Sequence, residues 1–152
     1  MKGAYLVAIS ALLLGTALAQ EPDGKSVYAQ NCQACHQPNG KGIPGAFPPL
    51  ENTLGSYYGI PEGRAFLVHV ITSGLQGEIE VAGTKYNGTM TPLSNLSDAE
   101  IAAVLNYVAT EFNSEKLPED FQPLAPEEVA QFRKANLSPA AVLEERSKLP
   151  AE

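Results

Sequence analysis

The stretch NCQACHQPNGKG, residues 31–42, contains both cysteines of this 152-residue chain and one of its two histidines. Cys32, Cys35 and His36 fall within five consecutive positions. Three kinds of site use cysteines at this spacing: a redox-active dithiol, one half of a zinc site, and a covalent attachment site for haem. The remainder of the chain decides between them.

Two of these interpretations conflict with the other residues. A structural zinc site takes four ligands, usually as two pairs, and the only histidine besides His36 is His69, so zinc is excluded by ligand count. A redox-active C-x-x-C motif begins a helix after a strand, whereas the preceding residues 23–31, DGKSVYAQN, themselves predict a helix. Covalent haem is the interpretation that remains.

The pattern C-x-x-C-H is the attachment signature of c-type haem. Two thiols at this spacing can add across the two vinyl groups of a porphyrin, and the histidine that follows can bind the iron. We therefore predict covalent attachment at Cys32 and Cys35, with His36 as an axial ligand. Its second ring nitrogen should donate to a carbonyl, that of Pro48 or Pro49, which would orient the imidazole.

The second axial ligand decides whether such a site carries electrons or binds small molecules. Met90, in YNGTMTPL, is the only methionine after the N-terminal segment, and we expect it in a polar loop before a helix. A thioether there is better explained as a soft iron ligand than as core filler. His69 lies on an apolar helical segment, RAFLVHVITSGL, and is interpreted as a surface or hydrogen-bonded core histidine.

The N-terminus has the plan of a secretory signal peptide. Lys2 is followed by an apolar run over residues 4–18 and by small residues at 17 and 19. The run falls short of the ~20 residues that span a bilayer, so we expect cleavage after Ala19 and a soluble periplasmic protein. Export agrees with covalent haem, which bacteria attach outside the cytoplasm.

The net charge of the chain limits the classes of binding partner that we expect. The chain has 17 acidic and ten basic residues, a formal net charge of −7, which argues against nucleic acid and anionic lipid. No acid–base pair or activated nucleophile is recognisable in the sequence. We therefore expect an electron-transfer protein and not an enzyme.

These residues resemble the class I cytochrome c family. Gly24, Tyr28 and Cys32 are four residues apart, and residues 97–112, SDAEIAAVLNYVATEF, have an apolar stripe at helical spacing after a capping box. The resemblance implies that Tyr28 crosses Tyr107 near Gly24, where two helices approach closely. It also implies that the carbonyl of Pro48 holds the axial histidine.

A closer resemblance, to the soluble c-type cytochromes of Thermus-group bacteria, covers nearly all of the chain. It is carried by NGKGIPGAFPPL, GLQGEIEVAGTKYNGTM, DAEIAAVLNYVAT and the tail from APEEV. It implies a mainly α fold around one haem c and its iron, with a C-terminal helical extension. It also implies a small β-hairpin, which we expect at residues 78–81 and 84–86, with Tyr86 supporting the haem site.

The resemblance implies that electrons pass from a bc-type complex, or another quinol oxidoreductase, to a terminal oxidase such as a ba3-type oxidase. We expect a monomer in transient complexes, without stable membrane insertion. This chain is acidic, whereas the proteins that it resembles are basic. Long-range steering toward a redox partner by positive surface charge therefore cannot be inferred from the resemblance. Apolar contact at Ile43, Ala46 and Phe47 could replace it, and Lys41 and Lys85 could add local positive charge.

The expected organisation is a signal peptide at 1–19, a cytochrome c domain at 20–112, and an extension at 113–152. Within the extension, we predict helices from Pro126 to about residue 135 and from Pro139 to about residue 148. We expect both to dock on the domain, covering the rear of the haem. Two other functional classes stay open: an open haem site that binds gas or peroxide, and a fixed electron-entry subunit of a larger complex.

Overall fold

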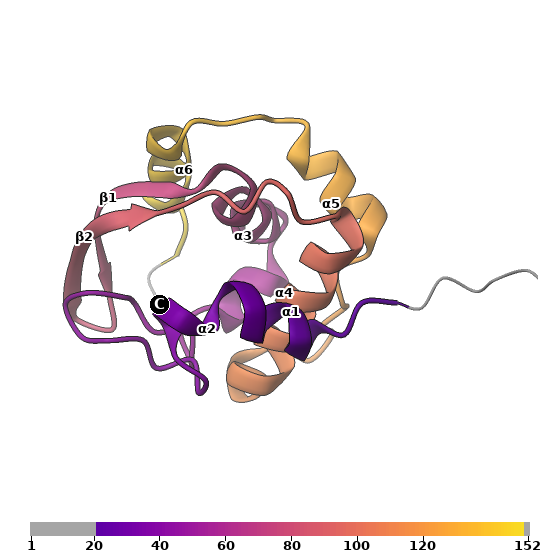
Figure 1. The fold of residues 1–152 in the computed structure, drawn as a ribbon, viewed down its shortest axis with the longest axis horizontal. Helices are drawn as coiled ribbons and strands as arrows, with labels where there is room; N and C mark the ends of the chain where they lie inside the picture. The colour runs from indigo at the N-terminus through magenta and orange to yellow at the C-terminus, as the bar shows by residue number, and fades with distance from the viewer. Residues whose placement is uncertain (1–20, 151–152) are drawn as a thin grey trace, which may run out of the picture.

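The structure, a computed structural model, describes residues 21–150, and the expected signal peptide lies outside this range. The helices and strands of the described range are α1 (Gly24–Asn31), α2 (Gln33–His36), the 3₁₀ helix η1 (Gly55–Gly59), α3 (Pro61–Ser73), β1 (Leu75–Val81), β2 (Thr84–Met90), α4 (Asp98–Phe112), the 3₁₀ helix η2 (Ser114–Lys116), α5 (Pro126–Arg133) and α6 (Pro139–Arg146). Helices dominate, and the two strands form one hairpin at the edge of the molecule (Figure 1). The predicted fold class is therefore confirmed.

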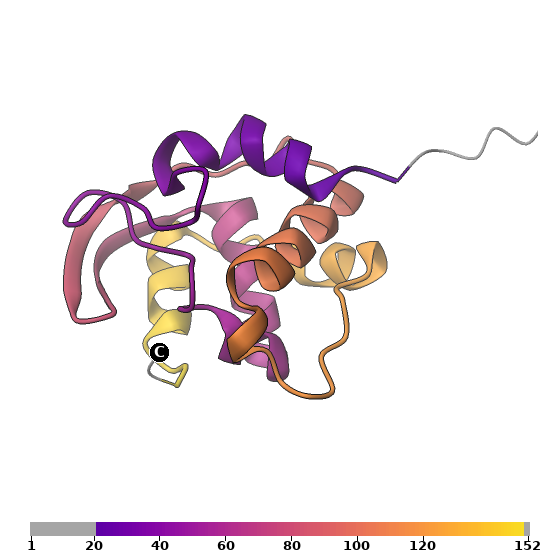
Figure 2. The same ribbon diagram turned by 90° about the horizontal axis from the view of Figure 1, so that it is seen from below.

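Helix α1 crosses α4, as the family resemblance implies (Figure 2). A Cβ atom on Gly24 would collide with the carbonyl oxygen of Ala103, so only glycine allows the helices to come this close. The rings of Tyr28 and Tyr107 pack at a centroid distance of 5.6 Å beside the crossing. Asp23 caps α1 by accepting hydrogen bonds from the backbone N–H groups of Lys25 and Ser26.

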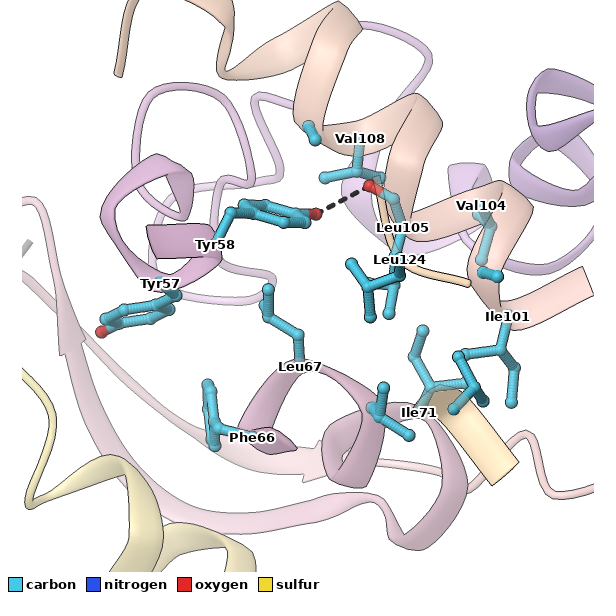
Figure 3. Close-up of a cluster of buried hydrophobic side chains, with 14 of the residues drawn as sticks. Tyr57, Tyr58, Phe66, Leu67, Ile71, Ile101, Val104, Leu105, Val108 and Leu124 are labelled. Atoms are coloured by element: carbon cyan, nitrogen blue, oxygen red, sulfur yellow. Dashed lines mark hydrogen bonds between the residues drawn. The ribbon is translucent and has the colours of Figure 1, made fainter. Parts of the chain in front are cut away.

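Helix α4 begins with the predicted capping box. The Ser97 hydroxyl accepts from the Glu100 backbone N–H, and the Glu100 carboxylate accepts from the Ser97 N–H. The predicted stripe of apolar residues is buried: Ile101, Val104, Leu105 and Val108. Helix α3, η1 and Leu124 complete this core, and the Tyr58 hydroxyl donates to the Leu105 carbonyl at 2.7 Å (Figure 3).

The hairpin is longer than predicted. Its strands pair from Leu75 opposite Met90 to Val81 opposite Thr84, and the turn at Ala82 and Gly83 has φ values of 48° and 75°. Positive φ at both positions matches a two-residue type I′ turn. Met90 is therefore the last residue of a strand, and its prediction in a loop was wrong. The prediction missed the ends of both strands because these ends contain glycines and polar residues, which have low β propensity.

The C-terminal extension is docked. Helix α5 packs on α3 and α4, and α6 packs on β1 and α3; in Figure 1 the connecting segment runs across the top of the molecule between them. Val129 and Val142 are fully buried. Arg64 pairs with Glu128 at 2.6 Å, fixing α5 to α3. Among residues 21–150, no helix is long and apolar enough to cross a membrane.

Candidate haem-binding site

A cavity of about 370 Å³ lies between α2, α3, the hairpin and α4. Cys32, Cys35, His36 and Met90 all line it, although they come from distant parts of the sequence. Most of its wall is apolar, including Phe66, Leu67, Ile71, Val104, Leu105 and Val108. The fold therefore brings the four residues predicted to bind haem and iron to one apolar site.

Cys32 immediately precedes the short helix α2, and Cys35 lies within it. Cys32 ends α1 and precedes α2, where it is half-buried, whereas Cys35 is exposed. Burial, with a smaller contribution from Cys35, raises the pKa of the Cys32 thiol to about 11. Redox-active C-x-x-C motifs lower this pKa instead. The environment of Cys32 thus gives no support to the dithiol interpretation.

His36 is buried and its ring is oriented by the backbone. Its Nδ1 donates to the Pro48 carbonyl at 2.9 Å. Because a carbonyl can only accept, Nδ1 carries the proton and Nε2 keeps its lone pair in the neutral ring. Burial lowers the pKa of His36, against the opposing effect of the Pro48 hydrogen bond. A neutral imidazole is the form that binds a metal.

The loop after His36 is folded back so that Pro48 reaches the ring. The Gly42 N–H donates to the His36 carbonyl at 3.0 Å, and Ile43 and Phe47 exchange two backbone hydrogen bonds of 2.8 Å. Gly42 has a φ of 62°, and a Cβ there would collide with the Phe47 and Pro48 backbone. Sequence reasoning missed Gly42, although glycine in a short loop beside a ligand is a usable signal.

Met90 and Tyr86 enter the cavity wall from β2. Met90 is half-buried and Tyr86 is buried. Three residues expected to support the site do not line the cavity: Gly24, Tyr28 and Tyr107. Of these three, Tyr28 contacts the loop after His36, because its hydroxyl donates to the Gln37 carbonyl at 2.6 Å.

His69 is a hydrogen-bonded core histidine, as one of its two interpretations predicts. It is 5 % exposed, and it is absent from the cavity wall. Its Nε2 donates to the Phe132 carbonyl at 2.9 Å, and its Nδ1 lies 2.8 Å from Glu145 Oε2. Both ring nitrogens are therefore engaged by the extension.

The two lysines expected to add positive charge near the haem loops are both paired. Lys85 Nζ lies 2.8 Å from Glu78 Oε1 across the hairpin, and Lys41 Nζ lies 3.8 Å from Glu51 Oε2. These exposed pairs reduce the local charge that either lysine could present to a partner.

The residues present fit a covalently attached haem. An apolar wall suits the porphyrin, two thiols beside the wall can form thioethers, and a neutral imidazole and a soft thioether suit iron. No group of three or more His, Cys, Asp or Glu residues in the range 21–150 is arranged to hold a metal ion by itself.

Fold and cavity together define a c-type cytochrome, and residues 22–111 match the cytochrome c family, to which the chain belongs. It is 51 % identical over 138 residues to a cytochrome c-552 of Thermus thermophilus, covering 91 % of this chain and 92 % of the relative. A second cytochrome c-552 of Thermus thermophilus is 49 % identical over 129 residues, covering 85 % of this chain and 98 % of the relative. Members of the family are electron carriers that bind covalently attached haem c.

Proposed function

We propose that this protein is a periplasmic carrier of single electrons, with one haem c attached to Cys32 and Cys35. His36 and Met90 are the axial ligands of its iron. The observation that carries this proposal is the shared cavity: both thiols, a neutral imidazole and the thioether line one apolar space. Residues 20–112 are the proposed cytochrome domain and residues 113–152 its extension, of which the described part, up to residue 150, is docked on the domain.

The bound haem supplies a one-electron couple at its iron. The residues of the chain keep the geometry of the haem site unchanged when the charge of the iron changes. The Pro48 carbonyl fixes the His36 ring through Nδ1, and the paired strands fix Met90 at the end of β2. The apolar side chains of α3 and α4 keep water out of the cavity, so little solvent has to reorganise for each electron.

The carrier accepts electrons from a quinol-oxidising complex of bc type and passes them to a terminal oxidase such as a ba3-type enzyme. Ile43 and Phe47, in the loop after His36, are the exposed large hydrophobic residues of the described range, at 42 % and 37 %. A contact centred on two exposed apolar side chains buries little surface area, which suits a short-lived redox complex. The acidic net charge and the paired lysines do not favour docking by positive charge on this chain.

Expression with a haem-attachment system tests the proposal. The wild-type chain should retain haem after denaturing electrophoresis, and Cys32→Ala combined with Cys35→Ala should lose it. The reduced protein should pass one electron per haem to a soluble acceptor. Absence of covalent haem in the wild-type chain would contradict the proposal.

Carbon monoxide distinguishes the carrier from an open haem site. With both axial positions filled by side chains, the reduced wild-type protein should show no spectral change under carbon monoxide. Met90→Ala should bind it readily. Rapid binding by the wild type would favour a gas-binding or peroxide-binding protein instead. Co-purification in a stable stoichiometric complex would favour a fixed electron-entry subunit.

A further inference from the structure

Residues 91–97, here called the methionine segment, connect the proposed ligand Met90 to helix α4 without regular secondary structure. Thr91 and Leu93 of this segment line the haem cavity. On the hairpin side, Met90 pairs with Leu75, and the strand pairing ends there. The contacts of the methionine segment therefore decide how firmly the backbone is held on the other side of Met90.

The end of α3 holds the first part of the methionine segment. The Leu93 N–H donates to the Ile71 carbonyl at 2.7 Å. Gly74, which follows α3 with a φ of 75°, lies so close to Met90 that a Cβ atom on residue 74 would collide with the Met90 carbonyl oxygen. Residues 94–97 lie beyond these contacts and are held from a different element.

That element is α5 of the C-terminal extension, which ends at Arg133. The Arg133 guanidinium makes three hydrogen bonds: Nη2 donates to the Leu96 carbonyl at 2.6 Å, Nη1 to the Ser94 carbonyl at 3.2 Å, and Nε to Asp98 Oδ1 at 2.7 Å. The Arg133 side chain is half-buried by these contacts. Because a guanidinium stays protonated at any ordinary pH and presents its donors as a rigid planar fork, one side chain fixes both the methionine segment and the first residue of α4.

A second arginine holds the same helix to a different place. Arg64 of α3 donates from Nε and Nη2 to the Glu128 carboxylate near the start of α5, at 2.6 Å each. Its Nη1 lies 3.4 Å from the Tyr58 carbonyl and 2.8 Å from the Gln122 carbonyl. Both arginines therefore dock α5 on the domain, but of the two only Arg133 bonds to the methionine segment.

We propose that Arg133 is a positioning residue for Met90, through which the extension holds the thioether at the iron. This inference rests on the haem site proposed above. Most side chains of the methionine segment are exposed, and such a segment opens locally at a lower free energy than the core around it. The hydrogen bonds from Arg133 raise that free energy, so Met90 leaves the iron less often and external ligands are kept out.

Displacement of Met90 by imidazole tests the inference in the full, haem-loaded, ferric protein. In this reaction the sulfur–iron bond breaks and a nitrogen–iron bond to imidazole forms, with no change in oxidation state. At saturating imidazole, the limiting rate reports how fast Met90 departs. Stopped-flow loss of the weak far-red absorption band of methionine-bound ferric haem measures this rate.

Arg133→Gln should raise the limiting rate about tenfold, since losing even one hydrogen bond to a charged donor changes an equilibrium by about that factor. Arg64→Gln is the matched control, because it makes the same change at the other arginine that docks α5. Its limiting rate should stay close to that of the wild type. Hydrogen exchange gives a second measurement: the protection of the Leu93 and Leu96 amides should fall in Arg133→Gln and not in Arg64→Gln.

A limiting rate in Arg133→Gln equal to that of the wild type, or an equal increase in Arg64→Gln, would overturn the inference. Limited proteolysis shows whether Arg133→Gln has released the extension. If it has, Arg133→Lys decides, because a lysine keeps a cation beside Asp98 but lacks the planar fork that reaches all three acceptors. Its limiting rate should exceed that of the wild type, and an unchanged rate overturns the inference.

Failure of the proposed function looks different from failure of this inference. The wild-type protein would then carry no covalent haem, or would lack the far-red band before any imidazole is added. If the wild type shows both, the proposed ligand is in place, and the comparison of Arg133→Gln with Arg64→Gln tests the role of Arg133 alone.

Discussion

At the scale of single residues, glycines allow several close contacts between backbone segments of this molecule. Gly24 lets α1 reach the Ala103 carbonyl of α4, and Gly42 lets the loop after His36 pass the Pro48 backbone. The second contact keeps the Pro48 carbonyl where it accepts from His36. The absence of a side chain at Gly42 thus allows the loop conformation that orients the ring of His36, the proposed iron ligand.

Gly24→Ala should destabilise the haem-loaded protein by about 3 kcal/mol, since the added methyl overpacks a contact made by backbone atoms. Gly83→Ala is the control. No atom lies within 4 Å of a Cβ there, so only the positive φ of 75° opposes the change, at about 1 kcal/mol. Denaturant unfolding measures both values. Equal losses would contradict the account of the α1–α4 crossing.

At the scale of elements, the start of α4 depends on the ionised Glu100 carboxylate. Hydrogen bonds from the Ser97 backbone and then from its hydroxyl lower the pKa of Glu100 below its ordinary value of 4.5. Because the folded pKa is depressed, the stabilisation is complete above the unfolded pKa and is lost as pH falls through the folded one.

The protection of amides at the start of α4 against hydrogen exchange, relative to their intrinsic exchange rate at each pH, should therefore decrease as the solution is acidified below about pH 4.5. In Glu100→Gln, the amide oxygen can still accept from Ser97 but has no charge to lose. In this variant, the amides at the start of α4 should be less protected against exchange at neutral pH, and their protection should change less on acidification. An identical acid response in both proteins would contradict the role of the carboxylate.

His69 holds the extension to the core, because its ring meets Phe132 at the end of α5 and Glu145 in α6. His69→Ala should lower stability by about 2–4 kcal/mol, through a cavity and two lost hydrogen bonds. Limited proteolysis should then cut within residues 134–150, while the wild type resists. Glu144→Gln, which disrupts only a surface pair on α6, serves as the control.

The elements show which features a sequence makes predictable. The helices of the extension were predicted because Ser138 and the prolines at 126 and 139 mark helix starts. The strand ends were not predicted, since Gly77 and Gly88 carry no strand signal. In the site, Cys32, Cys35 and His36 share one local motif, but Arg146 reaches the cavity only through tertiary packing.

At the scale of the whole molecule, the apolar cavity lies within the core formed by α3, α4 and the hairpin. A bound porphyrin would supply much of the apolar surface that these elements otherwise lack. Folding and haem binding should therefore be coupled, as for other ligands that bind only the native state.

The chain without haem should accordingly be largely unfolded at room temperature. Far-ultraviolet circular dichroism of the double variant Cys32→Ala with Cys35→Ala, purified without haem, should show a large loss of helix relative to the haem-loaded wild type. Helix content equal to that of the wild type would show that the extension and α4 suffice to hold the fold.

The central claim is a haem held between His36 and Met90 in one mostly apolar cavity, and the absorption spectrum of the oxidised protein tests it most directly. Ferric haem with a methionine ligand has a weak charge-transfer band in the far red. The account predicts this band in the wild type at neutral pH and its loss in Met90→Ala. Absence of the band from the wild-type, haem-loaded protein at neutral pH would contradict the assignment of Met90.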